Sequence, residues 1–234
     1  MFSCWKMSES IAGRRPDFLY YPSWPGYAES GHTPLAFEIL GDYGLFSRVD
    51  VSTAVAVSYP FPTWSAIKGM IETIFWRRDV WNIVPLGVEA LSPLEFTKYS
   101  FAYRGELRKR SQIASGACSL HRLQVLVNPA FRVVFDVRPG LKANGPDGSV
   151  ARFLRNFSTK LLTGDHPVLA MGTSDFIAFA RPVTEARIVS ERCWQAPLML
   201  KTPHGPGRCS VFFQNVVAKG GRLIFPLGQE VTGC

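Results

Sequence analysis

The segment between residues 97 and 122 combines positive charge with aromatic rings. It reads TKYSFAYRGELRKRSQIASGACSLHR; its aromatic residues are Tyr99, Phe101 and Tyr103, and its basic ones are Lys98, Arg104, Arg108, Lys109, Arg110 and Arg122. Cations can hold the phosphates of RNA while flat rings stack on unpaired bases. The segment therefore predicts an RNA-binding surface. The alternative is a solvated hairpin whose charges only keep it in water.

His121 is the residue of this segment that could also carry acid or base chemistry. Metal-free RNA cleavage needs a group that titrates near neutral pH to take the 2′-hydroxyl proton or to protonate the leaving oxygen. A phosphate or base contact is the plainer role. We favour that role because no partner residue is visible beside His121.

Other kinds of site find less support in the sequence. Lys68, Arg77 and Arg78 are weaker candidates for phosphate contacts, on or just after a predicted helix. The four histidines and five cysteines have no metal-ligand spacing, so we expect no metal site. Carboxylates are dispersed and no phosphate-binding loop of the nucleotide-binding type is present, so we expect neither a two-metal nuclease nor a bound cofactor.

The overall composition is that of a basic globular protein. Of its 234 residues 47% are hydrophobic and 19% charged, and 26 Lys and Arg against 18 Asp and Glu give a net charge of +8. An excess of this size favours a polyanionic partner. Five scattered cysteines fit a reducing cytoplasm. Without a signal peptide or a run of about 18 apolar residues, we expect a soluble protein with no membrane partner.

The elements that must position the basic segment begin at residue 36. Residues 36–40 alternate as a strand, and residues 51–59 do so again after a polar loop. A helix follows, with Thr63 or Ser65 as its N-cap. Its apolar residues recur at helical spacing: Ile67, Met70, Ile71 and Ile74.

The later elements complete an α+β order. Residues 80–91 predict a buried strand, bent or at an edge near Pro85 and Gly87, and residues 123–127 and 131–137 predict two more strands. A second helix at residues 149–162 starts at Asp147 or Ser149 and ends at Gly164. Short strands follow at residues 168–171, 176–183, 211–217 and 223–226. Strand, helix, strand, strand, helix, strand is the ferredoxin-like order.

This order divides the chain into three parts. Residues 1–34 form an aromatic and proline-rich extension that either packs on the body or a partner, or is a flexible arm. We expect a ferredoxin-like domain at residues 35–165, with the hairpin at about 97–122, and a β-rich domain at residues 166–234.

Three blocks of the sequence resemble the Cas-five family of CRISPR-associated proteins, most closely its type I-C (Dvulg) branch. They read GDYGLF, SYPFPTWSAIKGMIETIFW and WNIVPLGVEAL. Thinner similarity continues through YRGE, NPAFRVVFDV, MGTS and VFFQNVVAKGGRLIFP, so that the resemblance covers about residues 35–228.

The resemblance implies a RAMP-type protein with an RRM-like, that is ferredoxin-like, domain, a protruding basic β-hairpin and a small β-rich C-terminal domain. Members of this family hold the five-prime handle of the CRISPR RNA at the foot of the Cascade surveillance complex. They contact the first backbone subunit and the large subunit, and meet target DNA through the complex. The basic hairpin would correspond to the thumb of the family.

The sequence departs from the family at the positions that cut RNA in the type I-C branch. A Tyr at the end of the first helix and a Lys-His pair at the head of the second are replaced by Phe75, Ser149 and Val150. None of these can titrate near neutral pH. We therefore expect a handle-binding subunit that does not cut and works beside a separate processing nuclease. The alternatives are a metal-independent endoribonuclease that uses His121 on the precursor transcript, and an RNA-binding module outside CRISPR.

Overall fold

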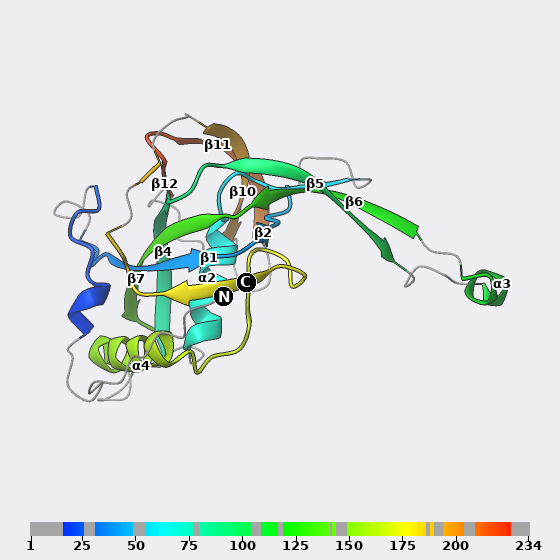
Figure 1. The fold of residues 1–234 in the computed structure, drawn as a ribbon. Coiled ribbons are helices and arrows are strands. Elements are labelled where there is room, and N and C mark those ends of the chain that lie inside the picture. The colour runs from blue at the N-terminus through cyan, green and yellow to red at the C-terminus, as the bar shows by residue number, and fades with distance from the viewer. Residues whose placement is uncertain are drawn as a thin grey trace.

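The chain forms a mixed α/β fold with antiparallel sheets, from which a long hairpin projects (Figure 1). The computed structural model describes residues 16–25, 31–48, 55–76, 80–103, 109–116, 119–140, 142–143, 149–185, 188–189, 194–203 and 209–225.

The central sheet has six strands in the order β12-β4-β7-β1-β9-β8. Its strands are β1 (Leu35–Leu40), β4 (Trp81–Ala90), β7 (Ala130–Pro139), β8 (Leu169–Ala170), β9 (Ile177–Arg181) and β12 (Arg222–Ile224). Every pairing is antiparallel. The register of β4 on β7 shifts between Pro85 and Gly87, which confirms the predicted bend. Proline has no N–H to donate to a ladder, so a bulge accommodates it.

Two helices cover one face of this sheet. Helix α2 (Trp64–Ile74) starts at Thr63, whose hydroxyl accepts from the Ala66 N–H at 3.3 Å, as predicted. Helix α4 (Val150–Thr163) starts at Ser149 and ends at Gly164, which adopts the left-handed conformation. Both caps satisfy backbone groups that a helix end leaves without partners. Both predicted helices are therefore confirmed, and the second differs from its predicted bounds, 149–162, by one residue at each end.

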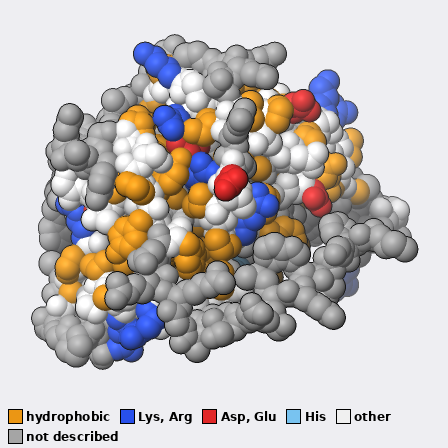
Figure 2. Space-filling model, turned by 60° about the vertical axis from the view of Figure 1, so that its left-hand side comes forward, with side chains coloured by type: hydrophobic (Ala, Val, Ile, Leu, Met, Phe, Trp, Pro, Cys, Tyr) orange, Lys and Arg blue, Asp and Glu red, His pale blue; other side chains and the backbone are white. Residues whose placement is uncertain are grey.

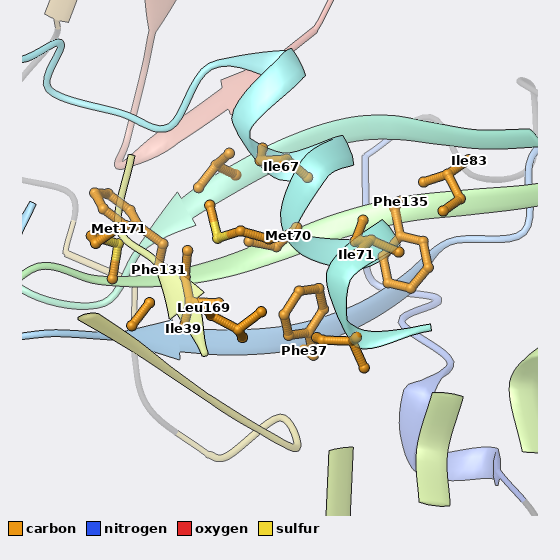
Figure 3. Close-up of a cluster of buried hydrophobic side chains, with 14 of the residues drawn as sticks. Phe37, Ile39, Ile67, Met70, Ile71, Ile83, Phe131, Phe135, Leu169 and Met171 are labelled. Atoms are coloured by element: carbon orange, nitrogen blue, oxygen red, sulfur yellow. The ribbon is translucent and has the colours of Figure 1, made fainter. Parts of the chain in front are cut away.

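The main core lies between the helices and the sheet (Figure 3). All four predicted apolar residues of α2 are buried, and Ile71 lies over Phe37 and Phe135 of the sheet. Phe37 also packs edge-on against Phe157 of α4, with ring centroids 5.6 Å apart. These rings join β1, β7 and both helices in one core.

The opposite face of the sheet buries charge. Arg132 on β7 donates to Glu38 Oε1 at 2.9 Å and to Glu89 Oε2 at 3.2 Å, and neither carboxylate is exposed. Burial alone would raise the pKa of Glu38, but hydrogen bonds from Thr184 and Arg132 outweigh it and hold that pKa below its ordinary value. Tyr21 donates to Glu89 at 2.8 Å, so residues before β1 are tied to the same cluster.

Part of the predicted N-terminal extension therefore packs on the body. The 3-10 helix η1 (Pro16–Leu19) leads to Trp24, which is 4% exposed against Ala36, Leu86 and Val134. Gly87 makes room for this ring, since a Cβ there would lie 2.5 Å from it. Residues 1–15 and 26–30 lie outside the described part of the chain.

The projecting hairpin consists of β5 (Glu95–Tyr103) and β6 (Ser119–Val127), with the short helix α3 (Arg110–Ala114) at its far end (Figure 1). At its base, β6 also pairs with β2 (Tyr43–Gly44) and, in parallel, with β3 (Ala56–Val57). Of the predicted strand at residues 51–59 the structure describes residues 55–59, and within these the strand is limited to β3.

A second ribbon pairs β10 (Trp194–Pro203) with β11 (Cys209–Ala218). Strand β10 was not predicted, because Pro197 and Pro203 argue against a strand; a two-stranded ribbon tolerates them because each strand is an edge. The predicted division at residues 165 and 166 stays a prediction. Strands β8, β9 and β12, which follow it, belong to the same sheet as β1.

Candidate nucleic-acid interface

The register of the hairpin sorts its side chains onto two faces. Lys98 lies opposite Gln124, and Ser100 lies opposite Arg122. Tyr99 lies opposite Leu123 between these two pairs, and Phe101 lies opposite His121 just beyond them. Directly opposed residues point to the same side of a ladder and neighbours along a strand point to opposite sides. The alternation of basic and aromatic residues in the sequence therefore becomes a cationic face and an aromatic face.

Further exposed cations lie at the far end of the hairpin. Lys98 and Arg122 are exposed on the strands, and Lys109 and Arg110 are exposed at the start of α3. Arg104 and Arg108, the other predicted contacts of the hairpin, lie outside the described residues. On the body, by contrast, Lys and Arg side chains are scattered among hydrophobic ones on the face drawn in Figure 2.

The aromatic face is a row of rings that runs from the body onto the hairpin. The ring centroids of Tyr43 and Tyr99 are 5.7 Å apart, and those of Tyr99 and Phe101 are 6.4 Å apart. The Phe101 ring stacks on the His121 ring, with a centroid distance of 5.5 Å and an angle of 21° between the ring planes. Tyr43 is 38% exposed and Tyr99 37% exposed. These two rings can therefore reach a base. One face of the His121 ring is already covered by Phe101.

Of the predicted contacts on and after the first helix, the structure describes Lys68. The ammonium of Lys68 lies 3.9 Å from Glu72 Oε1 and 5.3 Å from the centre of the Trp64 ring, and the side chain is 22% exposed. Its contact with Glu72 already satisfies part of its charge. Arg77 and Arg78 lie outside the described residues.

The positions that differ from the cutting branch hold structural roles. Phe75, the C-cap of α2, packs its ring 5.3 Å from Trp81 and 5.8 Å from Phe153. The Ser149 hydroxyl accepts from the Arg152 N–H, and its carbonyl accepts from Trp81 Nε1, each at 3.3 Å. Trp81 thus brings the end of α2 and the start of α4 together. Val150 packs against the core.

Potential metal ligands form no cluster among the described residues. No group of three or more His, Cys, Asp or Glu residues in them could hold a metal ion. His32 instead contacts Asp136 Oδ2 at 2.8 Å, and His166 contacts the Pro167 carbonyl at 2.9 Å. Within the same ranges, none of the helices is both long and apolar enough to span a membrane.

Residues 34–219 match the Cas_Cas5d model, which describes the CRISPR-associated protein (Cas_Cas5) family. This chain belongs to that family. The match includes the whole hairpin, α2 and α4, and it leaves out residues 1–33 and 220–234. It agrees with the resemblance found in the sequence.

Individual Cas_Cas5 relatives and structures support this placement. A "CRISPR pre-crRNA endoribonuclease Cas5d" of Thermus thermophilus is 28% identical over 151 residues, which are 63% of each chain. The chain thus spans less than two thirds of that relative's length. A solved CRISPR-associated protein has the same fold, with a TM-score of 0.62 at 12% identity over 86% of this chain and 96% of that one. A functionally uncharacterized protein from Streptococcus mutans gives a TM-score of 0.61 at 14% identity over the same shares.

Several potentially functional residues escaped the sequence analysis. Tyr43 joins the ring row from a distant strand, which only the fold reveals. Arg152, Asn156 and Lys160 recur every four residues on α4, and none of them was assigned a role from the sequence. Such spacing places side chains on one stripe of a helix, so this signal was available.

Proposed function

We propose that this chain binds CRISPR RNA as a subunit of a type I, Cascade-like surveillance complex in antiviral defence, and holds the five-prime handle of the guide along the hairpin. The observation that carries the proposal is the two-faced hairpin in a member of the Cas_Cas5 family. Exposed cations on one face can hold phosphates, and exposed rings on the other can stack on unpaired bases. A guide handle offers both.

The topology supports a ferredoxin-like core that presents this hairpin as a thumb. The element order β1, α2, β4, β7, α4, β9 and the neighbour order β4-β7-β1-β9 agree with it. We extend the proposal to contacts with the backbone subunit and the large subunit in the cytoplasm, and to target DNA through the complex.

We propose further that this subunit does not cut its RNA. Phe75 has no group that can exchange a proton, and the Ser149 hydroxyl does not titrate near neutral pH. Their side chains instead pack in an aromatic cluster and cap a helix. A separate nuclease would then supply the processed guide.

The direct test is the salt dependence of handle binding. A triple variant changes Lys109, Arg110 and Arg122 to Gln, and binding to a labelled handle RNA is measured from low to moderate salt. The slope of log K against log salt is negative, and each lost phosphate contact on a single strand should reduce its magnitude by about 0.7, so the triple variant should reduce it by about 2. A control changes Arg155 and Lys219, which are exposed outside the hairpin, to Gln. An unchanged slope in the triple variant would remove the hairpin from the interface.

The second candidate is a metal-independent endoribonuclease that acts on precursor CRISPR RNA. It is favoured by the similarity to the Thermus thermophilus relative, a pre-crRNA endoribonuclease, and His121 would be its acid or base. The purified chain is incubated with a labelled repeat hairpin in EDTA. A discrete cut that disappears in His121→Ala would establish this candidate. Intact RNA that remains bound would support the handle-binding role.

A further inference from the structure

One end of the central sheet carries exposed apolar side chains on two adjacent strands. Along β9, Ala178 is buried, whereas Ile177 is 54% exposed and Phe179 is 62% exposed. Val168, which immediately precedes the neighbouring strand β8, is 76% exposed. Exposed apolar residues are usually scattered singly over a protein surface, and a group of them indicates a contact site. We call Val168, Ile177 and Phe179 the β9 patch.

The strand register places the β9 patch on the face of the sheet that the helices leave open. Ile39 and Leu169 turn to the buried helix side (Figure 3), and so does Ala178, which lies opposite Leu169. Neighbours along a strand point to opposite sides of a sheet. Ile177 and Phe179 therefore point away from α2 and α4.

Other segments of the chain cover much of the rest of this face. Trp24 packs on Val134 of β7, and Val183 packs against the same cluster. The Thr184 N–H donates to Glu38 of β1 at 3.0 Å. These contacts lie over β1, β4 and β7. The β9 patch is thus the exposed apolar remainder at the β9–β8 end of the face.

The charges at the two ends of the β9 patch are opposite. Asp175 is exposed two residues before Ile177. Asp42 is exposed next to Gly41, where an added Cβ would lie 2.8 Å from the Ile177 carbonyl oxygen. At the other end, the Arg181 side chain is 43% exposed, although its Nε donates into the buried charge cluster of this face. Carboxylates therefore flank one end and a guanidinium flanks the other.

From this arrangement we infer that the β9 patch binds a second copy of this chain in a two-fold dimer. In such a dimer the same surface serves both subunits, so it must complement itself. A two-fold axis that crosses β9 at Phe179 reverses the strand direction. Phe179 then packs on the partner's Phe179, and Arg181 faces the partner's Asp175. The inference goes beyond the proposed function and does not depend on RNA binding.

The test is analytical ultracentrifugation of the full chain without RNA, over about 1–200 µM. We expect a monomer–dimer equilibrium that Phe179→Ser weakens. Because the dimer contains the residue twice, a loss of about tenfold per copy becomes about a hundredfold rise in the dissociation constant. Asp175→Lys, which would place two cations together, should weaken the dimer by at least tenfold. Ile224→Ser is the control: Ile224 is also exposed, but on β12 at the other edge of the sheet, and its loss should change dimerisation little.

Photo-crosslinking locates the contact. With p-benzoylphenylalanine in place of Phe179, the crosslinked dimer should join two peptides that both contain β9. A chain that stays monomeric over the whole concentration range, or a dimer that Phe179→Ser leaves intact, would overturn the inference. A monomer in which Phe179→Ser abolishes binding of a different protein would also overturn it and assign the β9 patch to that protein. Each of these results leaves the proposed RNA binding to its own test with the hairpin triple variant.

Discussion

Replacing Arg132 with Met should destabilise the fold strongly, because this side chain compensates two buried carboxylates. It is 6% exposed, and the Glu38 and Glu89 side chains that it contacts are 0% exposed. Removal of one member of a buried ion pair costs about 3–5 kcal/mol when the remaining charge is left alone.

The remaining contacts place Arg132→Met at the lower end of that range. Glu38 keeps Arg181 at 2.9 Å, and Glu89 keeps Arg222 at 2.7 Å. We therefore expect a loss of about 3 kcal/mol in the free energy of unfolding. In a chain of this size each kcal/mol lowers the melting temperature by about 2–4 °C, which gives a fall of about 6–12 °C.

Urea and thermal unfolding at pH 7, followed by circular dichroism, measure this loss. Arg138→Met is the matched control: Arg138 lies on the same face of β7 and bonds to Asp136 at 3.2 Å, but its side chain is 44% exposed. Asp136 is buried, but it keeps its contact with His32 at 2.8 Å, and the exposed Arg138 is screened by solvent, so we expect this control to lose about 1 kcal/mol or less. Equal losses in the two variants would refute the claim that burial of the Arg132 cluster determines its contribution.

Three further predictions concern single residues. The pKa of Glu38 is below its ordinary value of 4.5, so the stabilisation that Glu38 provides is complete above pH 4.5 and is lost as the pH falls through the lower pKa of the folded state. Urea unfolding from pH 7 to 3 should therefore show a steeper loss of stability with falling pH in the wild type than in Glu38→Gln. Parallel curves would contradict this. Ser149→Ala should cost about 1 kcal/mol by removing the N-cap of α4, measured against Ser149→Asn, which can cap. Gly172→Ala should lower the melting temperature well beyond the effect of Gly69→Ala, since Gly172 has a φ of 95° and an added Cβ would lie 2.0 Å from the Leu45 carbonyl; equal melting temperatures would exclude this strain.

The sequence was most informative where structure depends on neighbours along the chain. The Thr63 and Ser149 caps, the apolar stripe of α2 and the left-handed Gly164 depend on residues a turn away, and all are found in the structure. The hairpin segment was found by composition. Its two faces follow from alternation once the strand pairing is known.

Features that depend on distant residues escaped prediction. Tyr21 and Glu89 are 68 positions apart, and no local pattern pairs them. Trp76 and Lys160 line one pocket although β4, the whole hairpin and β7 lie between them in the sequence. The short helix α3 was missed because its residues were assigned to a continuous hairpin.

The outer half of the hairpin makes its ladder contacts within itself, since β5 pairs with β6 along its whole length. Evolution can therefore lengthen or shorten this arm without repacking the interior of the protein. A single inserted residue would move every later side chain of its strand to the opposite face of the hairpin. Insertion of two residues in each strand would instead keep the cations on one face and the aromatic rings on the other. Arm lengths among natural variants should accordingly differ by multiples of two per strand, with each increment extending the reach of the same two-sided surface.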